Sequence, residues 1–283
     1  ENPDVEKFLD IFSADYYRRS KVFYEKVDIL ANYVGHMKDK DWVEPEYDPY
    51  DWAFVAESNT RAARCNRIKA NSITGNGYSF DYSEKNLTKR QKNIAKRQIA
   101  KCKQLFKMFV NEETGEKDSF SSTFERIIID RESTGRSYLG VKRNRIDKIR
   151  ALFHSRAVNI RHRKVSAEFP SPAGFVRLDL LVLNNTGFTS DIKLNKTYYK
   201  AFGDKRVVNR RTGKIDPNTS VDELADELIE FSIYAPGLKY GVPRAATAKH
   251  AIQGNFYAGV QNVSLLRNDA TPRMAVIVEN GNL

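Results

Sequence analysis

DELIEFSIYAPGLKYGVP, residues 226–243, joins a predicted strand to a long predicted helix. Leu228 to Tyr234 is rich in apolar, aromatic and β-branched residues, as is typical of a buried strand. Ala235-Pro-Gly then marks a turn. Pro243 suits the first position of a helix, because proline has a fixed φ angle and no N–H that would need a partner there.

Residues 243–267 carry the periodicity of one helical face. Apolar residues recur there every three or four positions, at Ala245, Ala248, Ile252, Phe256, Val260, Val263 and Leu266. A helix from Pro243 to Arg267 would be roughly 37 Å long at about 1.5 Å per residue.

Small residues occupy other positions of the same helix, namely Ala246, Ala251, Gly254, Ala258 and Gly259. Each glycine inside a helix costs about 1 kcal/mol relative to alanine. The pattern therefore indicates close approach by a neighbouring helix or a partner. A core helix of one globular domain would explain the apolar face equally well.

The composition is that of a globular protein with an excess of basic residues. The 283 residues are 41% hydrophobic and 29% charged, and the net charge is +11. This charge favours contact with polyanions, nucleic acid first. No apolar run approaches the ~20 residues that span a bilayer, so we expect no membrane partner.

The cysteines and the start of the sequence limit the possible functions further. Cys65 and Cys102 lack CxxC or Cys/His spacing, which predicts reduced structural thiols and no metal site. The polar start, Glu1-Asn-Pro-Asp-Val, has neither Met nor the apolar region of a signal peptide. It indicates that the sequence begins inside a longer chain.

The first third of the chain predicts helices around one extended segment. Residues 5–34 have helical periodicity, and residues 41–50 combine prolines and aromatics as an extended segment over a core would. A helix is expected from Trp52 to Ile73, ending at Gly75-Asn-Gly77, and a strand over residues 78–82.

Residues 87–110 predict a strongly basic helix. Its Lys and Arg residues are Lys89, Arg90, Lys92, Lys96, Arg97, Lys101, Lys103 and Lys107. A nucleic-acid or membrane-surface helix has this composition. The simpler interpretation is the solvated outer face of a packed helix.

The middle of the chain predicts sheet structure. Apolar residues 124–129 lead through a Gly turn to a strand at 137–143, and 175–183 and 191–199 predict two strands joined by a turn at 184–187. An acidic cluster of Asp222, Glu223, Asp226 and Glu227 fits a solvated loop better than a metal site. His154 and His162 lack a nucleophile or carboxylate at a telling spacing and are expected to be structural.

Several separated motifs, taken in order, resemble the portal proteins of tailed bacteriophages. They are Trp42-Val-Glu-Pro, Ala56-Glu-Ser-Asn-Thr, Ile68-Lys-Ala, Ile73-Thr-Gly-Asn-Gly-Tyr, the runs 137–143, 148–154 and 158–161, Tyr199-Lys-Ala-Phe-Gly-Asp-Lys-Arg206, Tyr240-Gly-Val-Pro243 and Leu266-Arg-Asn-Asp-Ala-Thr-Pro272. The resemblance covers most of residues 42–280, and its specificity lies in the ordered set.

The resemblance implies an α+β portal fold. Residues 1–240 would be a mixed α/β wing, 241–267 a long stem helix, and 268–283 the start of an α/β clip. Portals of this kind continue into a second stem helix and a tunnel loop, so the resemblance also implies that the remainder is absent from this sequence.

The resemblance implies a structural role, with no enzyme activity and no cofactor of its own. Portal subunits form a ring, typically a dodecamer, at one capsid vertex of the virion, after assembly in the host bacterial cytoplasm. The ring is the channel for packaging and ejection of double-stranded DNA. Its other partners are the terminase large subunit, the head–tail adaptor, the major capsid protein and the scaffold.

On this resemblance, the stem helix carries the site residues. Arg244, Lys249, His250 and Arg267 are the candidates to face DNA phosphates. The small residues Ala246, Ala251, Gly254, Ala258 and Gly259 are the candidates for subunit contacts.

One enzymatic alternative stands beside this interpretation. Asp179, Asp191 and Lys193 have the D…(D/E)xK spacing of metal-dependent nucleases, in which paired carboxylates hold Mg²⁺ and the lysine steadies the attacking water. The motif is short and frequent by chance.

Overall fold

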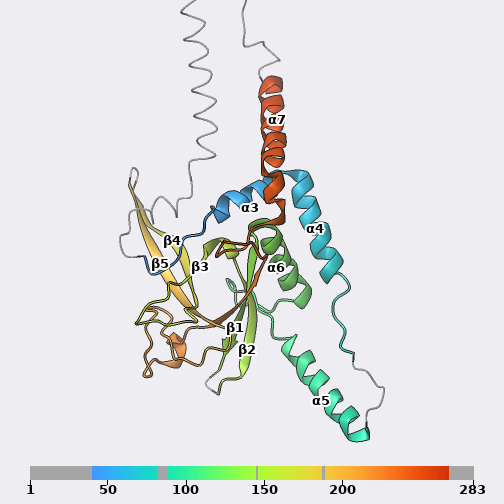
Figure 1. Ribbon diagram of the computed structural model, residues 1–283, viewed down its shortest axis with the longest axis vertical. Helices are drawn as coiled ribbons and strands as arrows, with labels where there is room; N and C mark the ends of the chain where they lie inside the picture. Colours follow the sequence, from blue (N-terminus) through green and yellow to red (C-terminus); the bar gives the residue numbers. More distant parts are fainter. Residues whose placement is uncertain (1–39, 82–87, 145, 187–188, 268–283) are drawn as a thin grey trace, which may run out of the picture.

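The computed structural model describes residues 40–81, 88–144, 146–186 and 189–267. Figure 1 shows an elongated molecule in which helix α7 (Lys249–Arg267) extends from one end and helix α5 (Lys89–Leu105) from the other. The expected helices at 5–34 and the expected clip segment at 268–283 lie outside the described residues.

The body of the molecule is a mixed sheet in the order β2-β1-β6-β5-β4-β3. Its strands are β1 (Arg136–Arg143), β2 (Ile149–Ser155), β3 (Ile160–His162), β4 (Phe175–Thr186), β5 (Thr189–Ala201) and β6 (Glu227–Ser232). Only the β5–β6 pairing is parallel among these strands. Helices and sheet together make the α+β class that the sequence predicts.

Both faces of strand β1 are buried, because its side chains alternate between two hydrophobic clusters. Tyr138 packs in one cluster with Phe153, Phe175 and Leu228. Leu139, the next residue along the strand, packs in a second cluster on the other face. Helix α6 (Phe120–Thr134) covers this second face through Ile127 and Phe124. The sheet is therefore a central layer rather than an outer wall.

Helix α6 and strand β1 form the helix, glycine turn and strand that the sequence predicts. Ser119 caps the helix by accepting the N–H of Ser122. Gly135 ends it with a φ of 83°, a left-handed conformation that glycine adopts without steric cost.

The helix expected from Trp52 to Ile73 is two helices, α3 (Pro49–Ser58) and α4 (Thr60–Thr74). Asn59 separates them in an extended conformation, and its side chain accepts the N–H groups of Arg61 and Ala62. A capping residue inside the apolar pattern therefore starts a new helix. The predicted strand at 78–82 is wrong over residues 78–81, which have no regular structure. There Tyr78 and Phe80 pack on Phe106 instead.

Residues 41–48 of the segment expected at 41–50 are extended over the core as predicted, whereas Pro49 and Tyr50 begin helix α3. Trp42 is 1% exposed and packs in a cluster with Val176, Leu178 and Tyr198. The predicted hairpin is also confirmed, but β4 and β5 continue through residues 184–186 and 189–190, where a turn was expected.

The acidic cluster differs from its prediction, because half of it is buried. Glu227 is 3% exposed and forms a two-bonded ion pair with Arg143, with Nε–Oε1 and Nη2–Oε2 distances of 3.0 and 3.1 Å. Asp226 is also buried, with Lys142 Nζ 3.9 Å away. These carboxylates can be buried in the sheet because they pair with basic residues from another segment of the chain.

The predicted outer face of a packed helix is also wrong for α5. None of its residues is buried, although Leu105 at its end touches the second cluster. The helix projects from the body instead of packing on it (Figure 1).

Candidate assembly interface

Two glycines bring the start of β1 against the segment that leads to α7. A Cβ on Gly241 would lie 2.3 Å from the carbonyl oxygen of Gly135, and a Cβ on Gly135 would lie 2.4 Å from that of Gly241. Both positions therefore require glycine. The contact fixes where the chain leaves the sheet.

Tyr240 fixes the same junction with its side chain. It is 1% exposed, its hydroxyl donates to the carbonyl of Val43 at 2.5 Å, and it accepts the N–H of His162 at 2.9 Å. The guanidinium carbon of Arg136 lies 4.1 Å from the centre of its ring. Burial raises the pKa of Tyr240, so the phenol is neutral at pH 7.

Helix α7 begins later than predicted. Pro243 has an extended ψ of 144° and precedes a 3₁₀ turn, η3 (Arg244–Ala248), and α7 itself runs from Lys249 to Arg267. At about 1.5 Å per residue the α-helical part is roughly 28 Å long, shorter than the 37 Å expected. The close contact at Gly241 holds Pro243 outside the helix.

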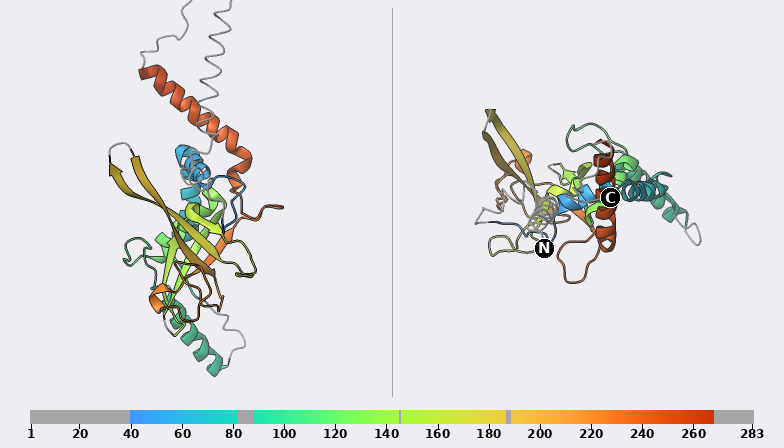
Figure 2. Two further views of the ribbon diagram at one scale, coloured as in Figure 1. Left: turned by 90° about the vertical axis from the view of Figure 1, so that its left-hand side faces the viewer. Right: turned by 90° about the horizontal axis from the view of Figure 1, so that it is seen from above.

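The first half of α7 docks on α3. The rings of Phe54 and Phe256 meet edge to face with centroids 5.8 Å apart. Lys249 Nζ lies 2.8 Å from Asp51 Oδ2. Asn59 also donates to the carbonyl of Ile252 at 3.3 Å. These contacts set the direction in which α7 leaves the body (Figure 2).

The second half of α7 is exposed. Gln253 is the buried residue of the helix, whereas Val260 and Val263 are each 50% exposed and Leu266 is 76% exposed. An exposed apolar face of this kind is typical of an interaction surface.

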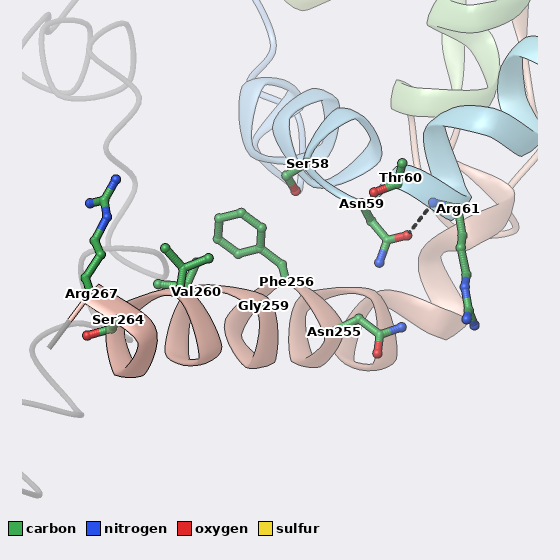
Figure 3. Close-up of a pocket in the computed structure, with 11 residues that line it drawn as sticks. Ser58, Asn59, Thr60, Arg61, Asn255, Phe256, Gly259, Val260, Ser264 and Arg267 are labelled. Carbon is green, nitrogen blue, oxygen red and sulfur yellow. Dashed lines mark hydrogen bonds between the residues drawn. The ribbon is translucent and has the colours of Figure 1, made fainter. Parts of the chain in front are cut away.

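A groove of ≈ 660 Å³ lies between this half of α7 and the corner of α3 and α4 (Figure 3). Phe256 and Val260 face the α3–α4 side of the groove in the close-up, and Arg267 lies at its far end. Asn59 and Arg61 supply polar groups from the opposite wall. The groove is thus apolar along the helix and polar at its ends.

The predicted subunit-contact residues are almost all exposed. Ala246 is half-buried, whereas Ala251, Gly254, Ala258 and Gly259 are exposed. A Cβ on Gly254 or Gly259 would meet nothing within 4 Å. Packing within the described part of one subunit therefore does not require these glycines.

The predicted DNA-facing residues occupy different environments. Arg244 and His250 are exposed near the start of the helix, and Arg267 is exposed at its end. Lys249 is half-buried, ion-paired with Asp51 and 4.8 Å from the ring centre of Trp52. The structure does not bring the four together at one place.

The residues of the nuclease alternative are not brought together by the strand register. The backbone of Asp179 pairs with that of Asn195, whereas Asp191 pairs with Asn184. At about 3.3 Å per residue this separates the two aspartates by more than 10 Å along the strands. The carboxylate of Asp179 instead accepts from Asn159 at 2.7 Å and from Arg177 at 3.0 Å.

The histidines and cysteines are the other residues whose side chains could take part in chemistry. His154 Nε2 lies 2.9 Å from Asp130 Oδ2, and His162 Nε2 lies 3.2 Å from Glu230 Oε1, so each histidine has a carboxylate partner from another segment of the chain. Cys65 and Cys102 are free, and Cys65 is exposed rather than buried. Among the described residues, no three His, Cys, Asp or Glu side chains are grouped so that they could hold a metal ion.

Asn59 is the interface residue that sequence reasoning missed. It caps α4, bonds to α7 and lines the groove. Its signal was the Ser58-Asn-Thr60 sequence, which is typical of a helix start but lies inside a continuous apolar pattern.

The chain is similar to two proteins of Bacillus subtilis (strain 168). It is 26% identical over 262 residues to the uncharacterized protein YqbA, covering 87% of this chain and 48% of the relative. It is 24% identical over 256 residues to XkdE of the phage-like element PBSX, covering 86% of this chain and 50% of the relative. The chain thus spans about half the length of these relatives.

Other comparisons add less. No family model matches the sequence. A chain in the solved neck of an empty GTA particle is similar over 88% of this chain and 53% of its own length, with 14% identity and a TM-score of 0.45. Similarity of this size does not by itself establish a shared fold. Within the described residues, no helix has the length and apolar content needed to cross a bilayer.

Proposed function

We propose that this chain is the wing and stem part of a portal subunit, which forms a ring around DNA in a phage-type particle. Two lines of support are the ordered set of portal-like motifs and the similarity to a protein of a phage-like element. A structural role in such a particle follows, with assembly as a homo-oligomer.

The exposed half of α7 is the observation that carries this proposal. It presents apolar side chains beside Gly259, where a Cβ would meet nothing within 4 Å. Glycine lowers helix stability, so its presence where one subunit leaves room for a side chain fits close contact with another copy. In a ring, α7 would be the stem helix, packed against its copies.

The remaining roles belong to the same proposal. Arg244, His250 and Arg267 are exposed and would contact DNA phosphates in the channel, whereas the ion pair with Asp51 makes Lys249 the weakest of the four candidates. The terminase large subunit and the head–tail adaptor would bind at the clip, for which 268–283 is the proposed start. The major capsid protein and scaffold would contact the wing.

The test is the mass of the purified full-length protein, measured by native mass spectrometry. We expect a ring of about a dozen subunits. Val260→Asp combined with Val263→Asp should abolish the ring, because each places a charge in the proposed interface. Their effect on the melting temperature of the subunit should be small, since both positions are half exposed.

A matched control places the same charges on another surface. Val165 is 60% and Ile146 is 68% exposed outside α7, so Val165→Asp with Ile146→Asp should leave the ring intact. A wild-type monomer, or equal loss of the ring in both pairs, would contradict the proposal. Cleavage of plasmid DNA in Mg²⁺ that disappears in Lys193→Ala would favour the nuclease instead.

A further inference from the structure

Helix α5 combines high positive charge with an absence of acidic residues. The helix contains seven Lys and Arg residues and no Asp or Glu, so it contributes +7 of the chain's net charge of +11. The rest of the chain is close to neutral for its size. The basic character of the protein is therefore a local feature of one helix.

The charges gather on one half of the helix. At 100° per residue, Lys89 lies nearest the middle of this half, with Lys96, Lys103 and Lys92 toward one edge and Arg97, Arg90 and Lys101 toward the other. Lys92 has a further interaction, whereas none of the other basic residues of α5 forms an ion pair with a carboxylate of the described residues. Repulsion between these cations is not relieved within the described part of the subunit.

The helix is nevertheless well defined at its start. Thr88 accepts the N–H of Gln91, and the side chain of Gln91 accepts the N–H of Thr88, which completes a capping box. Because none of its residues is buried, packing does not explain its length of 17 residues. A stable, unpacked and uniformly charged helix is suited to a partner of opposite charge.

The composition favours duplex DNA over other polyanions. The helix is about 26 Å long, and a DNA strand carries one phosphate per about 3.4 Å of axis, so several cations can contact phosphates together. No aromatic residue occurs in α5, so it lacks the stacking platform by which proteins hold unpaired bases. Such a helix would contact the backbone without reading sequence.

The position of α5 separates this surface from the stem. Figure 1 places α5 and α7 at opposite ends of the molecule. If α7 is the stem, α5 is the part of the wing farthest from it.

We propose that helix α5 is a second DNA-contacting surface, which binds the phosphate backbone of double-stranded DNA outside the stem. This inference rests on the proposed function for the presence of DNA, but its evidence is independent of α7.

The experiment measures binding of the full-length protein to a 30-base-pair duplex by fluorescence anisotropy between 50 and 300 mM salt. The test variant is Lys96→Gln, Arg97→Gln, Lys101→Gln and Lys103→Gln, because glutamine keeps helix propensity and removes charge. Affinity at 100 mM salt should fall at least tenfold. The slope of log K against log salt should become shallower by about 3 to 4, since each phosphate contact contributes about 0.9.

The control removes four charges from exposed loop positions elsewhere, with Lys164→Gln, Lys205→Gln, Arg211→Gln and Lys214→Gln. It should change affinity less than threefold. An equal loss of DNA affinity in both variants would mean that only the net charge matters, and it would overturn the assignment. Unchanged DNA affinity in the α5 variant would also overturn it.

Native mass spectrometry of the same two variants separates the two proposals. A ring that persists while DNA affinity falls supports α5 as the DNA surface. A ring that dissociates in the α5 variant, with DNA affinity retained, would assign α5 to an acidic face of a second copy. A wild-type monomer would overturn the portal proposal, while the comparison of DNA affinities would still decide the role of α5.

Discussion

At the scale of single residues, the junction between sheet and α7 depends on backbone contact more than on side-chain chemistry. Gly135 and Gly241 leave no room for each other's Cβ, and Tyr240 closes the same point with two hydrogen bonds. The point at which the chain leaves the sheet is therefore fixed largely by backbone atoms, which cannot rotate away.

Gly241→Ala should lower the free energy of unfolding by about 2 to 3 kcal/mol, because overpacking against atoms that cannot move has this order of cost. The new Cβ would meet the Gly135 oxygen at 2.3 Å and the Ile233 oxygen at 2.7 Å. Urea unfolding measures the loss. Gly237→Ala is the control, since it has a φ of 79° but nothing within 4 Å. A larger loss in Gly237→Ala would contradict the steric explanation.

The raised pKa of Asp226 predicts that the stability of the folded protein depends on pH. Burial raises the pKa of its carboxyl above 3.8, and Lys142 and Arg210 offset this only in part. The folded state then holds this proton more tightly than the unfolded state. The contribution of Asp226 to stability is therefore greatest at low pH and is lost as pH rises from 3.8 through the raised pKa.

Asp226→Asn removes this titration, so the variant should be more stable than the wild type at pH 7. The difference should shrink as pH falls toward 3.8. Chemical denaturation at several pH values measures it. A variant that is less stable by the same amount at every pH would mean that the ion pairs outweigh burial.

At the scale of elements, α7 has a docked half and an exposed half, and its glycines lie in surroundings that differ from those of Gly241. A Cβ on Gly254 would have no atom within 4 Å, so nothing in the described part of the subunit prevents a larger residue. A constraint at this position would have to come from another molecule.

Replacements at Gly254 test that constraint. Gly254→Ala and Gly254→Leu should each stabilise the isolated subunit by up to about 1 kcal/mol, because both residues favour the helix. Gly254→Leu should weaken ring assembly more than tenfold, whereas Gly254→Ala should weaken it much less. Mass photometry over a dilution series measures assembly. Equal assembly of both variants would exclude Gly254 from the interface.

At the scale of the whole molecule, a packed α/β body carries two projecting helices. The body holds the buried clusters around β1 and α6, while α5 buries none of its residues and α7 buries only Gln253. Stability is therefore unevenly distributed, and the projecting helices should open most readily.

Amide hydrogen exchange should show this distribution. In the isolated subunit, α6 and β1 should exchange slowly, whereas α5 and residues 258–267 should exchange fast. Ring formation should slow exchange in residues 258–267 and leave α5 unchanged, and duplex DNA should then slow α5. Protection of α5 on ring formation without DNA would contradict a free DNA-contacting surface.

Local sequence patterns were sufficient for the features that depend on neighbours a few residues apart. The runs at 137–143 and 175–183 were correctly predicted as strands, and Gly135 ended α6 as expected. The basic run at 89–107 and the small residues of α7 were also visible as patterns. These rules work because backbone conformation and helical spacing are local properties.

Only the tertiary structure shows which surfaces are buried. Asn59 divides the expected helix in two, where it caps α4 and bonds to α7, and Pro243 precedes a 3₁₀ turn instead of opening the α-helix. Glu227 enters the sheet because Arg143, 84 residues away, pairs with it. Burial and pairing depend on residues far apart in the chain, so local patterns cannot specify them.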